Sequence, residues 1–130
     1  MKRLIILLVV LALAFSCKKV EKEPLGPTDI RIRNLSTSNM TSLKISTGGG
    51  EHEFGNLPGV STTDYFRFEK AYPKANIYAV INGQVYKTDT AIYTYMQYLG
   101  KVKATYEIFI KSDAQKKLEI SNVILDAPLE

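Results

Sequence analysis

The chain has 130 residues, of which 45% are hydrophobic, 23% are charged and only one is a cysteine. This length suits one domain rather than two, and the composition calls for no disulfide framework. The formal charge of +4 does not indicate a nucleic-acid-binding protein, because residues 28–130 carry 12 basic and 11 acidic side chains, a balance of +1. A nucleic-acid partner would need a concentrated basic face, so we expect none.

The N-terminal segment is typical of a secretory signal. Residues 1–3 are basic in character and precede an unbroken apolar run over residues 4–15, with small Ser16 and then Cys17 after it. The apolar run would form a helix of roughly 18 Å, which is too short for a membrane span of about 20 residues. A basic start, a short apolar core and a small residue before the cut predict a signal peptide. The cysteine just past the cut either belongs to a motif formed by residues 14–17, described next, or stands there by chance after an ordinary secretory signal.

The sequence Ala14-Phe15-Ser16-Cys17 resembles the lipobox of Gram-negative bacterial lipoproteins. The resemblance implies cleavage before Cys17, a diacylglyceryl group on its sulfur and acylation of its amine, and two or three chains suffice for stable anchoring. Ala14 and Phe15 depart from the usual pattern, in which leucine and a smaller residue stand there. Lys18 occupies the position where aspartate would suggest retention in the inner membrane. The resemblance therefore implies sorting to the outer membrane, with the domain facing the periplasm or the outside.

Three segments follow from this interpretation. Residues 1–16 are expected to be the signal peptide, residues 17–27 a lipidated tether, and residues 28–130 one folded domain. The tether carries charges of both signs and ends in Pro24-Leu25-Gly26-Pro27. Prolines bias the chain toward extended shapes, so this segment is expected to space the domain from the lipid surface.

From Thr28 onward the hydrophobic pattern is typical of β-strands. Ile30 and Ile32 alternate with arginines, so one face is apolar and the other is charged, as a half-buried strand requires. Similar strands are expected at residues 43–45, 52–57, 66–68, 84–88, 101–111 and 118–125. The run at residues 76–81 is apolar at nearly every position, which predicts a central strand covered on both faces.

Turn signals separate these expected strands. Asn82-Gly83 lies between two β-rich runs and predicts a type I′ hairpin, in which both central residues need positive φ. The glycines at residues 48–50 predict a flexible turn, and residues 56–64 have the composition of a loop. A β-bulge is expected near Asn122.

Together these elements predict an all-β fold. About seven strands with closely spaced turns are typical of an antiparallel β-sandwich, and a closed barrel is the alternative. The apolar spacing over residues 92–99 predicts a short helical crossover between the two sheets. The pattern of residues 28–130 resembles the immunoglobulin-like and transthyretin-like domains of small bacterial lipoproteins, which implies an immunoglobulin-like sandwich without the disulfide and core tryptophan of antibody domains.

Residues that could carry catalysis or hold a metal are sparse. His52 is the only histidine, and it stands between Glu51 and Glu53 on an expected strand, where neighbouring side chains point to opposite faces. A nucleophilic triad needs a base and a third group that orients it, and a zinc site needs three or four clustered ligands. We therefore expect no enzymatic activity, no metal and no cofactor.

The tyrosines are the strongest candidates for a binding surface. The chain has eight tyrosines and no tryptophan, and Tyr93, Tyr95 and Tyr98 crowd one short stretch. Tyrosine combines a large apolar body with a hydrogen-bonding tip, so the cluster suggests a platform for a sugar ring or a protein partner. The alternative is that Tyr93 and Tyr95 share a strand face and cover the edge of the core. Tyr98 would join them only if a turn intervenes near Gln97.

The expected function is that of a lipid-anchored envelope module that presents loop and sheet surfaces to another envelope protein or a glycan. A hydrolase inhibitor or immunity lipoprotein is one alternative, for which residues 56–64 offer a candidate loop. A glycan-binding module is a second, and it should expose Tyr93, Tyr95 and Tyr98 together. An enzyme is a third, and it should bring His52 next to a second polar partner in a cleft.

Overall fold

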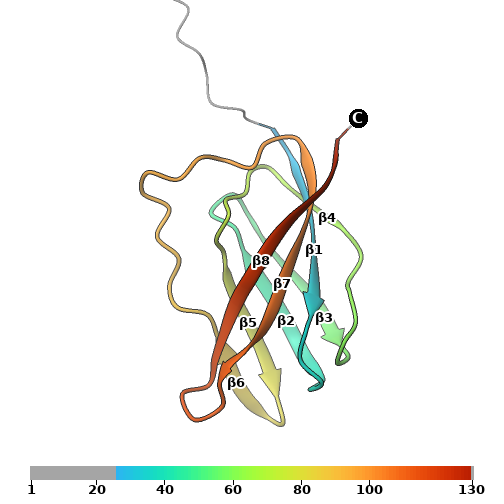
Figure 1. Cartoon of the computed structure of the whole chain (residues 1–130), viewed down its shortest axis with the longest axis vertical. Coiled ribbons are helices and arrows are strands. Elements are labelled where there is room, and N and C mark those ends of the chain that lie inside the picture. The colour runs from blue at the N-terminus through green and yellow to red at the C-terminus, as the bar shows by residue number, and fades with distance from the viewer. Residues whose placement is uncertain (1–25, 130) are drawn as a thin grey trace, which may run out of the picture.

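The computed structural model describes residues 26–129 (Figure 1). Cys17, the expected signal peptide and all but the last two residues of the expected tether lie outside the described residues. The described part contains eight strands and no helix that could cross a membrane. The strands are β1 (Thr28–Asn34), β2 (Met40–Ser46), β3 (Glu51–Leu57), β4 (Phe66–Phe68), β5 (Asn76–Ile81), β6 (Gln84–Lys87), β7 (Val102–Ser112) and β8 (Lys117–Pro128).

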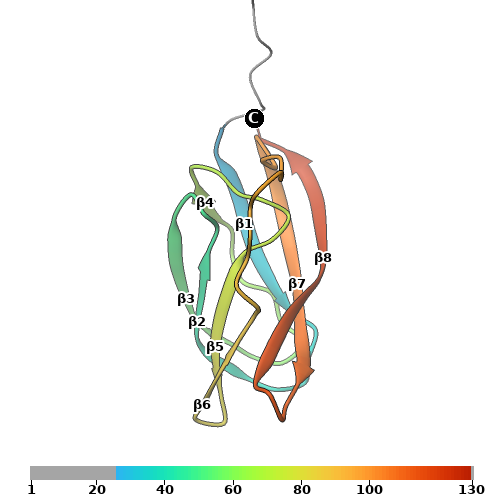
Figure 2. The same ribbon diagram turned by 90° about the vertical axis from the view of Figure 1, so that its left-hand side faces the viewer.

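All eight strands belong to one sheet, in the order β3-β2-β5-β6-β8-β7-β1-β4. The sheet curls until its end strands, β3 and β4, approach each other, which makes it a nearly closed barrel (Figures 1 and 2). The prediction of about seven antiparallel strands in a sandwich is not confirmed, because β1 pairs with β7 and β6 pairs with β8 in parallel. Hydrophobic alternation reports which face of a strand is buried and says nothing about which strand lies beside it.

The sheet has two weak junctions, and a loop lies over each. Strands β6 and β8 share a single residue pair, Lys87 with Lys117, and β3 and β4 are not paired with each other. Residues 88–101, which we call the crossover, run along the barrel between β5 and β7 in Figure 2. Residues 58–65, which we call the edge loop, lead from β3 to β4 on the other side.

The inward faces of the strands form the core. Strand β7 buries Ala104, Tyr106 and Ile108, in agreement with the predicted alternation. Strand β5 buries Ile77, Ala79 and Ile81 but leaves Tyr78 39% exposed, so the prediction that both faces of this strand are covered was wrong. An apolar residue can stand on either face, and the uniform run concealed the alternation. The buried hydrophobic core consists of Ile30, Ile32, Met40, Leu43, Ile45, Leu57, Phe68, Ala71, Ala75, Ile77, Ala79, Ile81, Tyr86, Ala104, Tyr106, Ile108 and Leu118.

The predicted turns have mixed outcomes. Asn82 and Gly83 have φ of 51° and 76°, as a type I′ hairpin requires. The register between β7 and β8 shifts near Asn122, which confirms the bulge. The predicted helix at residues 92–99 is wrong, because this stretch is irregular apart from one turn in which the Met96 N–H donates to the Tyr93 carbonyl. Tyr95, inside that turn, has a φ of 65°, which an α-helix cannot accommodate.

Candidate functional site

The crossover is fixed to the barrel at both ends. Near its start the Ala91 N–H donates to the Asn76 side-chain carbonyl at 2.7 Å. Near its end the Leu99 N–H donates to the Ala71 carbonyl at 2.8 Å, and the Leu99 side chain packs against the core. The stretch between these bonds is therefore held over the barrel although it contains no regular structure.

Three tyrosines, Tyr72, Tyr93 and Tyr98, hold the middle of the crossover, and we call them the tyrosine cluster. The ring centroids of Tyr72 and Tyr93 are 4.4 Å apart in a stacked pair, and those of Tyr72 and Tyr98 are 4.8 Å apart. The Tyr93 hydroxyl donates to the Ser46 carbonyl at 3.3 Å. Gly48 lies against the stack with a φ of 80°, and a Cβ there would come within 3.0 Å of the Tyr93 ring. Glycine at this turn both adopts the positive φ without steric cost and leaves room for the Tyr93 ring.

The tyrosine cluster is supported from the core. The hydroxyl of Tyr106, which is fully buried on β7, donates to the Tyr72 main-chain carbonyl. Burial raises the pKa of Tyr106 and also that of Tyr93. Both hydroxyls therefore stay protonated at neutral pH and act as donors. The Lys70 Nζ lies 5.1 Å from the Tyr98 ring centroid, so a cation stands at the border of the cluster.

Tyr95 is separate from this cluster and fully exposed, with a relative accessibility of 103%. The structure thus brings Tyr93 and Tyr98 together around Tyr72 but leaves Tyr95 alone at the turn. The expectation that Tyr93 and Tyr95 share a strand face is wrong, because the stretch is not extended. Sequence reasoning missed Tyr72, since it lies far from Tyr93 in the chain and nothing in the local pattern connects the two.

The edge loop is held by main-chain hydrogen bonds. The Asn34 N–H donates to the Ser61 carbonyl, the Thr63 N–H to the Ile32 carbonyl and the Val60 N–H to the Ser36 carbonyl, each at 2.9 Å. At its tip Val60 is 73% exposed and has a φ of 58°. Positive φ is rare for a β-branched residue and indicates local strain.

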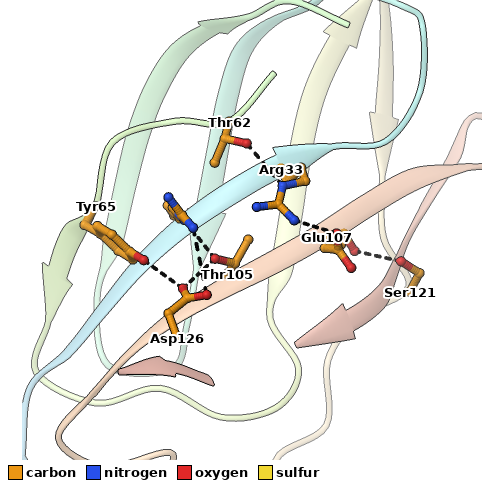
Figure 3. A network of polar contacts seen from close by, with 8 residues as sticks. Arg33, Thr62, Tyr65, Thr105, Glu107, Ser121 and Asp126 are labelled. Atoms are coloured by element: carbon orange, nitrogen blue, oxygen red, sulfur yellow. Dashed lines mark hydrogen bonds and ion pairs between the residues drawn. The ribbon is translucent and has the colours of Figure 1, made fainter. Parts of the chain in front are cut away.

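A polar network on the outside of β1, β7 and β8 fastens the end of the edge loop (Figure 3). Asp126 accepts hydrogen bonds from the Tyr65 hydroxyl at 2.7 Å and the Thr105 hydroxyl at 2.6 Å, and Arg31 lies 3.8 Å away. Burial opposes ionisation of Asp126, but the two hydrogen bonds and the arginine charge outweigh it and lower the pKa of Asp126. Burial, followed by the bond to Asp126, raises the pKa of Tyr65.

A second part of this network pairs Arg33 with Glu107 at 3.0 Å, and the Arg33 guanidinium also donates to the Thr62 hydroxyl at 3.3 Å. Its charged groups are therefore already matched by protein partners. This arrangement is typical of a structural network that joins strands, and it presents no unmatched charge to a ligand.

His52 lies in the gap between β3 and β4. Its ring stacks on Phe66 with centroids 3.6 Å apart and meets the Phe54 ring edge-on at 4.7 Å. Two aromatic rings therefore fix the position of the imidazole. Among residues 26–129, no three His, Cys, Asp or Glu side chains come together as a metal-binding group.

Comparison with known proteins informs the fold alone. No family model matches the chain, and no curated protein matches it. A protein from Eubacterium rectale whose structure was determined by NMR is similar, with a TM-score of 0.50 and 17% sequence identity over 82% of this chain and 100% of that chain. At this identity the likeness supports a common all-β architecture and carries no information on activity.

Proposed function

We propose that this protein is a lipid-anchored envelope module that acts by binding another protein rather than by catalysis. Cys17 carries the lipid, residues 17–27 form the tether, and the domain of residues 28–130 is held at the outer membrane on its periplasmic or outer side. The resemblance of residues 14–17 to a lipobox supports the anchor. The fixed crossover supports the binding role.

The fold is proposed to be a variant of the immunoglobulin-like sandwich. The single pair between β6 and β8 and the unpaired ends β3 and β4 divide the sheet into two four-stranded halves, β3-β2-β5-β6 and β8-β7-β1-β4. Two such halves facing each other across a core meet the description of a sandwich.

Tyr95 is the single observation that carries the binding proposal. An aromatic side chain that is fully exposed contributes nothing to the core, yet the crossover holds it in a left-handed conformation that disfavours any residue with a Cβ. Retained strain of this kind is typical of functional positions. Tyrosine is also enriched among the anchors that dominate protein interfaces, and a held loop loses little entropy on binding. A partner with an apolar pocket would accept this ring.

The proposal is tested by photo-crosslinking in cells that produce the full chain. A photoreactive phenylalanine analogue replaces Tyr95 in one variant and Gln115, which is exposed in the turn between β7 and β8, in the control. We expect a discrete adduct from position 95 that is absent from position 115, and we expect Tyr95→Ala to weaken capture of the same partner. The same adducts from both positions, or none from position 95, would contradict the proposal.

The lipid anchor has its own test. Metabolic labelling with a fatty-acid probe is expected to mark the wild-type chain and to miss Cys17→Ser. Equal labelling of both chains would end the lipoprotein interpretation without affecting the crosslinking result.

A hydrolase inhibitor is the second candidate function, and Val60 favours it. Inhibitory loops are stiff and present one residue to the target, and the edge loop presents Val60 between three main-chain hydrogen bonds. The photoreactive analogue placed at position 60 separates the two functions. A discrete adduct with a hydrolase from position 60, and none from position 95, would favour the inhibitor.

A further inference from the structure

A row of three side chains crosses the outer face of β2, β5 and β6. Lys44 on β2 is paired with Tyr78 on β5, and Tyr78 is paired with Lys87 on β6. Residues directly opposite in neighbouring strands point to the same face, and strands lie roughly 4.8 Å apart. The backbones of the two lysines are therefore about 10 Å apart, twice that spacing, with the exposed Tyr78 ring between them.

This row lies in a groove with a volume of about 470 Å³. The start of the crossover contributes Thr88 and Thr90 to its lining, and the ends of β2 and β5 contribute Ser46 and Asn76. The volume is within the range of small-ligand sites, about 300–1,000 Å³. The complete lining consists of Lys44, Ser46, Glu51, Asn76, Ile77, Tyr78, Lys87, Thr88 and Thr90.

Several polar groups of the groove are available to a ligand. Within residues 26–129, the Tyr78 hydroxyl, the Lys87 ammonium and the Ser46 hydroxyl form no hydrogen bond or ion pair. Lys44 is different, because it pairs with Glu51 at 3.2 Å. Two lysines and one glutamate leave the groove with a net charge of +1, and Lys87 holds the uncompensated charge.

We propose that this groove binds a sugar residue that carries a carboxylate. The C–H face of a sugar ring packs on the electron-rich face of an aromatic side chain such as Tyr78. The Lys87 ammonium would pair with the carboxylate as a point charge, and the Ser46 and Thr90 hydroxyls would bond to sugar hydroxyls.

The charges favour a sugar with one carboxylate over an acidic peptide. A polyanion would meet Glu51 as well as Lys87, whereas one carboxylate needs only the single uncompensated cation. The groove shares no residue with the exposed Tyr95 of the crossover, so this proposal does not depend on the protein-binding function. Sequence reasoning missed the site because it placed Tyr78 on a strand covered on both faces.

Saturation-transfer NMR on the full chain in detergent micelles tests the proposal. The probes are glucuronic acid, galacturonic acid and N-acetylneuraminic acid, with glucose as the neutral control. We expect transfer to the ring protons of at least one acid and little transfer to glucose. Lys87→Gln is expected to weaken binding about tenfold, and Tyr78→Ala to abolish it. Tyr78→Phe, which keeps the ring and protects against a folding artefact, is expected to weaken binding only about threefold, for the loss of one hydrogen bond.

The control variant is Lys101→Gln, which removes an exposed lysine outside the groove. Absence of transfer to all three acids, or an equal loss of binding in Lys101→Gln and Lys87→Gln, would overturn the proposal. Complete displacement of the sugar by a tetraglutamate peptide at equal concentration would also overturn it, because the groove would then recognise acidic protein segments.

Discussion

The edge loop and the crossover lie over the two weak junctions of the sheet, but different interactions hold them. The edge loop is bound by three main-chain hydrogen bonds to β1 and to the turn that follows it, and the side chains of Asn34 and Tyr65 add further bonds, so it behaves as an irregular extension of the sheet. The crossover is bound largely by side chains, through Asn76, the tyrosine cluster and the hydroxyl of Tyr106. Main-chain bonds tolerate almost any residue, whereas stacked rings require particular residues at particular places.

Despite this difference, each loop presents one exposed residue with positive φ, Val60 in the edge loop and Tyr95 in the crossover. A loop must be held firmly before it can keep such a residue in a disfavoured conformation. The comparison therefore indicates that both loops are rigid. It also indicates that substitutions which weaken one loop should leave the other in place.

The largest effect is expected from Asn34→Ala, below the edge loop. Asn34 is fully buried, its amide donates to the Ser38 and Pro58 carbonyls at 2.8 and 3.3 Å, and its carbonyl oxygen accepts from the Ser36 N–H at 2.9 Å. The substitution removes all of these part-buried bonds together, so the free energy of unfolding measured in urea should fall by about 3 kcal/mol. Asn56→Ala, on the exposed part of β3, should lose under about 0.5 kcal/mol. Equal losses would mean that the edge loop does not depend on this buried amide.

Tyr93→Ala probes the crossover in the same way. It removes a stacked, half-buried ring, and the free energy of unfolding should fall by about 2 kcal/mol. Tyr93→Phe, which removes only the bond to Ser46, should lose about 0.5–1 kcal/mol. Tyr95→Ala should lose under about 0.5 kcal/mol, since the ring is fully exposed. A large fall in melting temperature for Tyr95→Ala would show that this ring is packed and would remove the basis of the binding proposal.

Asp126→Asn is expected to show that part of the attachment of the edge loop depends on pH. The folded-state pKa of Asp126 lies below its ordinary value of 3.8. The ionised group therefore contributes stability above that ordinary value, and the contribution disappears as the pH falls through the folded-state pKa. At pH 7 the free energy of unfolding of the wild type should exceed that of the variant by about 1 kcal/mol, because solvent screens this partly exposed group. In urea titrations the difference should begin to shrink below about pH 4 and should keep shrinking as the pH falls toward the folded-state pKa. A difference that is constant from pH 7 to pH 3 would contradict the assignment.

The smallest effects are expected from Val60→Gly and Tyr95→Gly, and they should be alike. Glycine relieves a left-handed penalty of roughly 1–2 kcal/mol but adds about 0.4–1 kcal/mol of entropy to the unfolded chain. The free energy of unfolding of each variant should therefore rise by about 0.5 kcal/mol, which is measured as a small rise in melting temperature. Thr94→Gly, at a position without positive φ, should lose stability. Destabilisation by all three glycines would mean that the two loops are not strained.

Local patterns predicted the features that depend on neighbours in the chain. Alternation located the strands, as in β1 and β7, because a residue on the wrong face would expose apolar surface. The positive φ of Asn82 and Gly83 followed from the steric demands of a two-residue turn, and the bulge near Asn122 followed from an interruption of the alternation. The crossover was correctly predicted to connect two strands. The helix predicted within it is absent, because apolar spacing alone cannot exclude a turn at Tyr95.

The sequence by itself determined that the domain from residue 28 onward is all-β and which face of most strands is buried, since these properties follow from side-chain alternation and local sterics. Only the tertiary structure decided that β1 lies parallel to β7, that Tyr72 stacks on Tyr93, and that Tyr78 stands between two lysines in a groove. Each of these contacts joins segments that are distant in the chain. They depend on the order in which strands associate and on how far the sheet curls, and no local pattern encodes either.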